Sequence, residues 1–435
     1  AGRDAGLSDG LGAVLIEEHE RVTRPRLERW WRYYRNELEL GPPRVGARGE
    51  LEHVERQAQE QGLPTRVTGT RPTLGLEDRA LPRREVVVEN DIAWRVQAMV
   101  DLMFGKPVKI HSIAEDGAKV ELIEALLDAV WEASGGIALL QDMALLGHVY
   151  GHVDLVVRVD EVGLELAGSS LGSSVGTGSP TAAELRQLAE LVRIEVVEPT
   201  RGIAVLDEDD YRRLLAFGIH AERELNEIEP GGRGFAGLFD RGRADASKAR
   251  RRRGTRTEWI EPGLRTVALD GKVVRQEEVR LFGDELGVVH IQNIAQPFRH
   301  EGLGEVEPLV ALQDELNTRL SDRASRVTMQ SFKMYLARGI EGFEKVAVGP
   351  GQVWSTDSPD AEVQAFGGDV YSPSEDEHIT QVREAMDKAS GVSPVVLGLL
   401  RARIGHLSSE NALRVTLMGV LAKAARKRMS YGRGI

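Results

Sequence analysis

The sequence of 435 residues contains no cysteine. Disulfide bonds and thiolate metal sites are therefore excluded. No run of about 20 apolar residues is present, which is the length that a helix needs to span a bilayer. The N-terminal residues lack the basic start and the long apolar stretch of a secretory signal. We expect a soluble protein of two or three domains without a membrane partner.

Motifs for nucleotide and metal binding are also missing. The chain has no G-x-x-x-x-G-K-[ST] loop and no G-x-G-x-x-G followed by a helix in a βαβ setting. His148 and His152 have the H-x-x-x-H spacing of zinc proteases, but Val149 stands where the required glutamate would be. We interpret both histidines as structural, with metal binding as the alternative. No cofactor, metal or catalytic residue is predicted, although an enzyme with an unrecognised site stays open.

Acidic residues outnumber basic ones, 68 to 56, and the formal net charge is −12. Proteins that hold DNA by its phosphates are more often basic. A protein that must let DNA slide past benefits from an acidic wall, because each contact between a phosphate and a cation adds to the grip.

Residues 1–84 are predicted to form an N-terminal helix and an extended arm. Apolar residues between 11 and 40 recur near helical spacing, with a break or kink expected at Pro25. Residues 41–82 are rich in Gly, Pro, Arg and Glu and have no steady period. This composition predicts an extended arm or a disordered linker.

Residues 85–303 are predicted to form an α+β domain whose second half is rich in strands. Flexible loops are expected at 166–180, which is rich in Gly and Ser, and at 231–254. The pair Asp270 and Gly271 is the strongest hairpin signal in the chain. Helices are expected at 91–104, 119–133, 137–146, 182–191 and within 207–226, and strands at 84–89, 153–160, 192–197, 255–260, 265–269, 272–280 and 287–292.

The loop at 231–254 contains four consecutive arginines at 250–253. We interpret it as a flexible, solvated segment. Clustered arginine is also the electrostatic footprint of a contact with DNA or RNA, so that alternative stays open.

The last third of the chain alternates long helices with short inserts. Apolar residues at spacings of three and four predict a helix over 305–336, about 45–50 Å long. The β-rich insert at 340–366 is too small to have a core of its own. A second helix is predicted at 373–390, followed by an apolar loop at 391–407 and a third helix from 408 onwards.

This order of segments resembles the core of tailed-phage portal proteins, the head-to-tail connector family. Two stem helices flank a small clip domain in that family, and a tunnel loop then leads into a long wing helix. Upstream, residues 90–110 (NDIAWRVQAMVDLMFGKPVKI), 289–293 (VHIQN) and 302–308 (GLGEVEP) are similar to the family's wing entry and to the strand and turn before its first stem helix. The resemblance covers roughly residues 85–428.

The resemblance implies a portal-like α+β fold that assembles into a ring, expected to be a dodecamer, with double-stranded DNA in its channel for packaging and ejection. Terminase, the major capsid protein and a head-completion or adaptor protein are the implied partners. The location is a capsid vertex of a virion, in a phage or a gene-transfer particle, after assembly in the host cytoplasm. The crown is expected to be missing or short. The implied parts are a wing domain at 85–303, stem helices at 304–338 and 372–390, a clip at 339–371, a tunnel loop at 391–408, and a wing helix with the start of a crown at 409–435.

Residue roles also follow from the resemblance. Arg401 or Arg403 would touch phosphates without reading bases. The implied tunnel-loop residues are Val395, Val396, Leu399, Arg401, Arg403 and His406. The implied stem lining is Asp314, Arg319, Glu375, Asp376 and Glu384, and the implied docking surface for terminase on the clip is Lys345, Gln352, Trp354 and Glu362.

A different class of function stays open beside this one. The chain would then be a non-catalytic nucleic-acid-binding or scaffolding protein that acts through the arginines at 250–253 as a monomer or dimer. A mass measurement in solution separates the two hypotheses.

Overall fold

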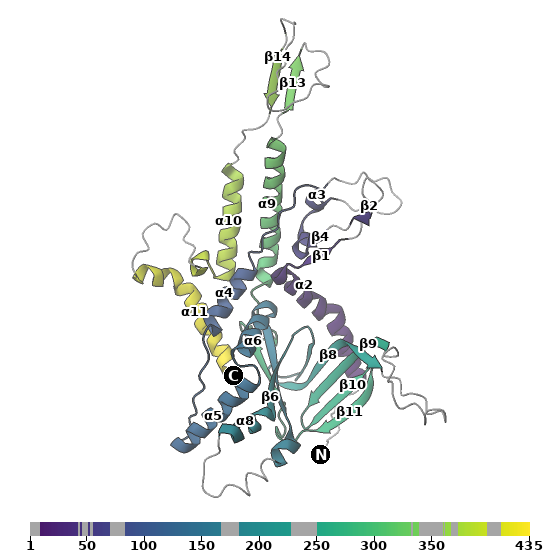
Figure 1. Cartoon of the computed structure of the whole chain (residues 1–435), viewed down its shortest axis with the longest axis vertical. Helices are drawn as coiled ribbons and strands as arrows, with labels where there is room; N and C mark the ends of the chain where they lie inside the picture. Colours follow the sequence, from purple (N-terminus) through teal and green to yellow (C-terminus); the bar gives the residue numbers. More distant parts are fainter. Residues whose placement is uncertain are drawn as a thin grey trace, which may run out of the picture. The chain divides into compact units, whose positions relative to one another are not determined.

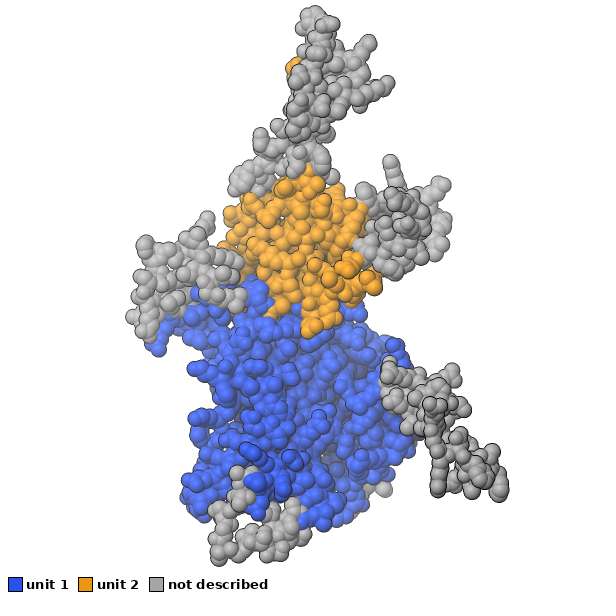
Figure 2. All heavy atoms as spheres, viewed as in Figure 1, with its two compact units in different colours: residues 1–34, 94–307, 394–435 blue, residues 35–93, 308–393 orange. Residues whose placement is uncertain are grey.

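The structure is a computed structural model that describes residues 9–41, 44–45, 51–52, 55–69, 83–166, 182–227, 250–331, 334–338, 360, 362–366, 373–397 and 410–435. The chain divides into two compact units (Figure 2). Unit 1 comprises Ala1–Tyr34, Trp94–Glu307 and Pro394–Ile435, and unit 2 comprises Arg35–Ala93 and Pro308–Ser393. Among the described helices, none is both long and apolar enough to cross a membrane.

The N-terminal helix is continuous but changes its winding before the proline. Helix α1 (Asp9–Glu18) leads through a π-helical turn, η1 (His19–Thr23), into α2 (Arg24–Arg35). Pro25 is the second residue of α2 and has no N–H to donate, so the hydrogen-bonding pattern must change there. The predicted irregularity at Pro25 is confirmed. The expectation of helix up to residue 40 is wrong, because α2 ends at Arg35 and Leu38–Leu40 forms strand β1.

The described residues of unit 1 form two antiparallel sheets. The smaller sheet has the strand order β12-β5-β6, and the larger has the order β11-β10-β9-β8-β7. The strands are β5 (His152–Val159), β6 (Val192–Val197), β7 (Gly202–Leu206), β8 (Leu214–Glu227), β9 (Arg250–Glu261), β10 (Leu264–Leu269), β11 (Lys272–Glu278) and β12 (Val288–Gln292).

Strand β5 carries the core on both of its faces. Val153 and Leu155 pack among buried residues of three helices, α4 (Ala93–Phe104), α6 (Gly136–Tyr150) and α11 (Glu410–Gly434). Val156 packs instead against Phe217 and Ile260 of the larger sheet. Successive side chains on a strand point to opposite faces, so β5 separates a helical layer from a second sheet. Two further helices, α5 (Gly117–Ala133) and α8 (Ala182–Glu190), contact each other and β6.

Several predicted elements of unit 1 are confirmed. The hairpin between β10 and β11 turns at Asp270 and Gly271, whose φ values are +47° and +76°. Positive φ at both central residues is what a tight hairpin turn of this type requires, and Asp-Gly supplies it at low cost. The predicted helices that correspond to α4, α5, α6 and α8, and the predicted strands that correspond to β5, β6, β9, β10, β11 and β12, are also present.

Two predictions in unit 1 are wrong. The helix expected within 207–226 is replaced by strand β8, and the arginines at 250–253 begin strand β9 instead of lying in a loop. In the register of this pair, Arg250 lies opposite Glu227 and Arg253 lies opposite Glu224. The rest of the predicted loop, residues 231–249, lies outside the described residues.

Unit 2 is built around two helices, α9 (Val310–Ser331), which follows the short η5 (Glu307–Leu309), and α10 (Pro373–Ser390). The predicted second helix at 373–390 is confirmed. The predicted first helix ends earlier than expected, at Ser331, and Met334–Arg338 forms strand β13, which pairs with β14 (Glu362–Phe366). The small β module therefore begins before residue 339.

The predicted linker is partly folded. Residues of unit 2 between 38 and 69 form β1, β2 (Arg44–Val45), β3 (Leu51–Glu52), β4 (Glu55–Gln57), η2 (Ala58–Gly62) and α3 (Thr65–Thr68). Gln59 and Val67 are fully buried. The prediction was wrong here because the order of this segment comes from contacts with distant residues, such as the hydrogen bond of 2.8 Å from Asn317 Nδ2 to Gln59 Oε1.

Residues 84–89 were predicted as a strand, but residues 83–91 pair with no other strand among the described residues. Their alternate backbone N–H groups donate instead to side chains of α9. The pairs are Glu85 with Ser325 (3.2 Å), Val87 with Ser321 (3.0 Å), Glu89 with Asn317 (3.0 Å) and Asp91 with Gln313 (3.0 Å). We name these four hydrogen bonds the α9 ladder.

Replacing Asn317 by leucine is expected to loosen the α9 ladder locally. Asn317 is fully buried, accepts from the Glu89 N–H and donates to Gln59, so leucine removes both hydrogen bonds and leaves the Glu89 N–H without its acceptor on α9. Each unsatisfied buried group costs about 1–3 kcal/mol, which corresponds to roughly ten- to hundredfold faster local opening. Amide hydrogen exchange of the peptide 85–91 measures this. Thr328→Ala, an exposed change on the same helix, is the control, and equal exchange in both variants would contradict the role of Asn317.

Candidate functional site

Helices α9 and α10 lie side by side in unit 2 (Figure 1). Ile379, Val382 and Met386 of α10 are buried at spacings of three and four residues, as are Leu316 and Leu320 of α9. This periodicity puts the apolar side chains of each helix on one face. The charged residues of both helices are exposed or half-buried, and the predicted channel residues are among them.

The first turn of α10 forms ion pairs with α9. Arg323 Nη1 lies 3.0 Å from Asp376 Oδ1, and Arg326 pairs with Glu375. Anionic side chains at a helix N-terminus are also stabilised by the helix dipole. Both predicted lining residues of this turn, Glu375 and Asp376, are thus neutralised by arginines of the neighbouring helix.

The charge of Arg319 is balanced within α9 itself. Its Nε lies 2.6 Å from Glu315 Oε1, and its Nη1 lies 3.5 Å from Asp322 Oδ2. Glu315 also has His378 Nε2 of α10 at 3.1 Å. Partial burial opposes the charge of Glu315, but the hydrogen bonds from Arg319 and His378 outweigh it and lower the pKa of this carboxyl.

The exposed surface of the pair is acidic on the α10 side. Helix α10 carries five acidic and two basic residues, whereas α9 carries three of each. Glu377 and Glu384 are exposed seven residues apart, and this spacing puts them on the same face of a helix. Asp314, the remaining predicted lining residue, is half-buried. The pair of helices thus has exposed glutamates on α10 and arginines on α9 that already pair with carboxylates.

Most other predicted site residues lie outside the described residues. This applies to Lys345, Gln352 and Trp354 of the predicted clip and to Leu399, Arg401, Arg403 and His406 of the predicted tunnel loop. Glu362 is the first residue of β14 and lies opposite Arg338 in the register with β13. Val395 and Val396 are half-buried in a short 3-10 turn, η7 (Pro394–Leu397).

Comparison with known proteins identifies the family. The profile of the family described as "Phage portal protein, SPP1 Gp6-like" matches residues 14–435. The chain belongs to this portal family. The predicted relationship to portal proteins is therefore confirmed, as are the mixed helix-and-sheet class and a portal role. Portal families are generally structural and not enzymatic.

Two solved structures that match the chain come from gene transfer agent particles. One is titled "Virion of native gene transfer agent (GTA) particle", with 12% sequence identity over 77% of this chain and 77% of that chain and a TM-score of 0.38. Another is titled "Neck of empty GTA particle computed with C6 symmetry", with 12% identity over 78% of this chain and 79% of that chain and a TM-score of 0.40. No curated protein matches the chain.

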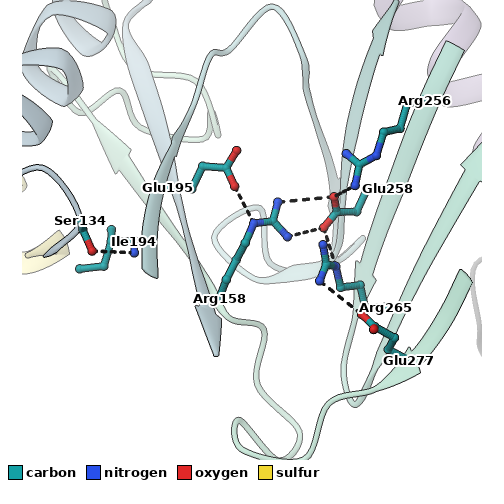
Figure 3. Close-up of polar contacts among 8 residues, drawn as sticks. All are labelled: Ser134, Arg158, Ile194, Glu195, Arg256, Glu258, Arg265 and Glu277. Carbon is teal, nitrogen blue, oxygen red and sulfur yellow. Dashed lines mark hydrogen bonds and ion pairs between the residues drawn. The ribbon is translucent and has the colours of Figure 1, made fainter. Parts of the chain in front are cut away.

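Unit 1 of this portal protein contains a buried charge network that the sequence did not predict. Glu258 of β9 is fully buried and binds three arginines (Figure 3). Its carboxylate lies 2.6 Å from Arg158 Nη1 of β5, 2.9 Å from Arg256 Nη2 and 2.7 Å from Arg265 Nε. Burial opposes the charge of Glu258, but the hydrogen bonds from Arg158 and Arg265 outweigh it and lower its pKa to about 2.

The outer end of this network is balanced by two further carboxylates. Arg158 Nε lies 2.5 Å from Glu195 of β6, and Arg265 Nη1 lies 3.3 Å from Glu277 of β11 (Figure 3). The network joins the two sheets beside a cavity of about 670 Å³. Because every arginine in the network has an acidic partner, we interpret it as structural. One feature of the sequence could have revealed this network. Side chains alternate between the two faces of strand β5 (HVDLVVRV), so Arg158 lies on the same face as Val156 and hence between the sheets.

A second cluster joins Asp154, His290 and His300. Each offers a possible metal-ligand atom, and these atoms lie within 4.8 Å of one another. However, His290 Nδ1 lies 2.7 Å from Asp154 Oδ1 and its Nε2 lies 2.8 Å from the His300 carbonyl oxygen. The His290 and His300 rings stack at 3.7 Å with 20° between their planes, so their ring nitrogens lie in nearly parallel planes and do not converge on one ion.

The same geometry fits a buried ion pair. A carboxylate and a carbonyl oxygen can only accept hydrogen bonds, so both nitrogens of His290 act as donors, as in an imidazolium. Burial opposes this charge, but the hydrogen bond to Asp154 outweighs it and raises the pKa of His290. Burial and the nearby His290 lower the pKa of His300 to about 3. The sequence analysis missed this cluster because Asp154 lies more than a hundred residues before the two histidines in the chain.

The segment GLGEVEP has a structural reason for its glycines and its first glutamate. A Cβ atom on Gly302 would lie 2.4 Å from the carbonyl oxygen of Gly151, and one on Gly304 would lie 2.8 Å from that of Val149. The two backbone segments therefore approach too closely for any side chain. Beyond this crossing, Glu305 is 3% exposed and pairs with Lys423 and Lys427 of α11.

Proposed function

We propose that this portal chain assembles into a closed ring in which the paired helices α9 and α10 of each copy line a channel for double-stranded DNA. The observation that carries the proposal is the charge arrangement of the pair in a member of the portal family. Arg319, Arg323 and Arg326 all have carboxylate partners, while Glu377 and Glu384 are exposed.

This arrangement suits a surface past which DNA moves. A protein grips DNA mainly through cations that replace the counter-ions of its phosphates. Arginines that already pair with carboxylates have less positive charge to offer, and exposed glutamates repel phosphates. The helices can therefore surround DNA without holding it in one position.

The finer assignments belong to the same proposal. The parts are a wing at 85–303, stems at 304–338 and 372–390, a clip at 339–371 that docks terminase, and a tunnel loop at 391–408 that approaches the DNA. Arg401 and Arg403 would contact phosphates in passing. The ring would be a dodecamer at a capsid vertex, with the major capsid protein and a head-completion protein as neighbours.

Native mass spectrometry and particle images of the purified full chain test the ring. We expect large closed rings with a central hole, whose mass gives the subunit number. Only monomers or dimers across salt and protein concentrations would overturn the proposal. That result, together with DNA binding that is lost when the arginines at 250–253 are changed to serine, would favour the alternative of a nucleic-acid-binding protein.

A charge reversal tests the channel lining. The variant Glu377→Lys with Glu384→Lys should still form rings but should retain double-stranded DNA in a salt-dependent manner, because each added cation near a phosphate steepens the salt dependence. A filter-binding assay at several salt concentrations measures this. The matched control is Glu121→Lys with Glu132→Lys, two exposed positions on α5 in unit 1. Equal DNA retention by both variants would place the channel lining elsewhere.

A further inference from the structure

Unit 1 has an open pocket of about 770 Å³ at the edge of its smaller sheet. Its lining comes from strand β12, from the segment that follows it at 295–300, from residues 211–214, and from the C-terminal end of α11. We name it the β12 pocket. It is separate from the α9 and α10 surface, which belongs to unit 2.

Strand β12 presents backbone hydrogen-bonding groups to this pocket. It is the terminal strand in the order β12-β5-β6. Gly287 accepts a hydrogen bond from Val157 on the β5 side, and Asn293 donates one to Gly151 on that side. In an antiparallel ladder, alternate residues face the partner, so Val288, His290 and Gln292 direct their N–H and C=O groups away from β5. A strand edge that pairs with no other described strand is a template for one more strand.

The charge of the β12 pocket is positive. Arg212, Arg299 and Arg433 line it and are exposed, and no carboxylate is part of the lining. None of the three forms an ion pair with another described residue; Arg212 Nε donates instead to the Tyr211 hydroxyl at 3.0 Å. This differs from Arg213, which does not line the pocket and lies 3.3 Å from Asp207. Three arginines that form no ion pair with a described residue therefore line one pocket.

An exposed aromatic residue stands beside the pocket. Phe298 is 87% exposed and has a φ of +59°, a conformation that is rare for a bulky residue. Its ring lies 6.1 Å from that of Tyr211, which lines the pocket. A bound partner would explain why an aromatic ring is held exposed in this conformation, because the Phe298 ring could cover apolar side chains of that partner.

We propose that the β12 pocket binds an extended acidic segment of a partner protein, which adds to β12 as a further strand and pairs its carboxylates with Arg212, Arg299 and Arg433. Main-chain hydrogen bonds to the strand edge supply affinity in this mode of recognition, and side-chain pockets supply specificity. Arginine forms paired hydrogen bonds with carboxylates, which fixes the register of the added strand.

A peptide fits these features better than a nucleic acid does. The edge of β12 offers alternating donors and acceptors, which an extended peptide complements and a phosphodiester backbone, having only acceptors, does not. Apolar side chains such as Val288 and Leu214 also line the pocket and can be covered by alternate side chains of a strand. The net charge of −12 repels a dense polyanion more than a short acidic segment.

The test measures fluorescence anisotropy of a labelled peptide of about eight residues, a usual strand length, in which valine and glutamate alternate. The full chain in its native assembly is titrated into it. We expect saturable binding that weakens on the order of tenfold for each of Arg299→Glu and Arg433→Glu, because each change replaces an attraction by a repulsion. Arg213→Glu is the matched control and should bind the peptide as the unchanged protein does. All three positions are exposed, so folding is preserved.

Two altered peptides and one oligonucleotide complete the experiment. A peptide with lysine in place of glutamate should not bind, and a peptide with alternate amide nitrogens methylated should lose binding because it cannot pair with the strand edge. No binding of the acidic peptide, or equal binding by Arg299→Glu and by Arg213→Glu, would overturn the proposal. Tighter binding of a single- or double-stranded oligonucleotide through the same arginines would replace the peptide by a nucleic acid. None of these outcomes depends on whether α9 and α10 line a channel.

Discussion

Replacing Glu305 by glutamine is expected to cause one of the largest losses of stability that a single change in this chain can produce. Glu305 is 3% exposed and pairs with Lys427, which is fully buried, and with Lys423. Removing one member of a buried ion pair leaves the other charge without compensation, at a cost of about 3–5 kcal/mol. Urea unfolding followed by circular dichroism measures the loss, and unit 1 should unfold at lower urea concentration.

Two controls separate burial from charge. Lys427→Met should cost less than Glu305→Gln, because Glu305 keeps Lys423 as its partner and methionine fills the space of the lysine chain. Glu301→Gln breaks the exposed pair with Arg26, which is 2.7 Å apart, and should change stability by no more than about 1 kcal/mol. Equal losses of stability for Glu305→Gln and Glu301→Gln would show that the buried pair contributes no more to stability than the exposed pair.

Acid is expected to weaken unit 1 through Glu258 as well. The pKa of Glu258 is about 2 in the folded protein, below the ordinary value of 4.5, so its contribution is fully present above pH 4.5 and is lost as the pH falls towards 2. A shift of this size corresponds to about 3 kcal/mol. Glu258→Gln should therefore destabilise the protein at neutral pH and flatten the decrease of stability between pH 4.5 and 2.

Urea midpoints at a series of pH values test this prediction. Glu277→Gln is the matched control, because Glu277 binds the same Arg265 at the half-buried outer end of the network. That variant should keep the acid-dependent decrease of the unchanged protein. A Glu258→Gln variant whose stability falls just as steeply between pH 4.5 and 2 would contradict the assignment of the low pKa to Glu258.

Sequence reasoning succeeded where local signals decide the structure. The Asp270–Gly271 hairpin depends on two residues that tolerate positive φ, and α10 has acidic residues in its first turn and Gly391, with a φ of +65°, after its end. Each of these signals lies within a few residues of the feature that it predicts. The order of the long helices, which carried the resemblance to portal proteins, rests on the same kind of pattern.

It failed where distant residues decide. Residues 84–89 have the composition of a strand, but alternate backbone N–H groups in this segment donate to side chains of α9. The arginines at 250–253 have the composition of a loop, but their strand is set by pairing with β8. Neither partner can be chosen from the local sequence alone, because composition does not say which distant segment will lie alongside.

The candidate site shows the same limit. The sequence pointed to charged residues on α9 and α10, but it could not tell which charges are neutralised. That Arg323 meets Asp376, and that Glu384 remains exposed, depends on the axial alignment of the two helices. The roles assigned to the clip and the tunnel loop stay predictions.

The α9 ladder has a mechanical consequence for unit 2. Its acceptors recur every four residues on a helix, about 6 Å along the axis, and its donors recur every two residues on an extended chain, about 6.6 Å apart. Because these two spacings nearly coincide, the four bonds would be strained together under an axial load and would have to break together before the helix could slide. The next position in which donors and acceptors match again lies one repeat of the hydrogen bonds away, which is four residues along α9. Under tension along its axis, α9 should therefore keep its position up to a threshold force and then slip in discrete steps of about 6 Å.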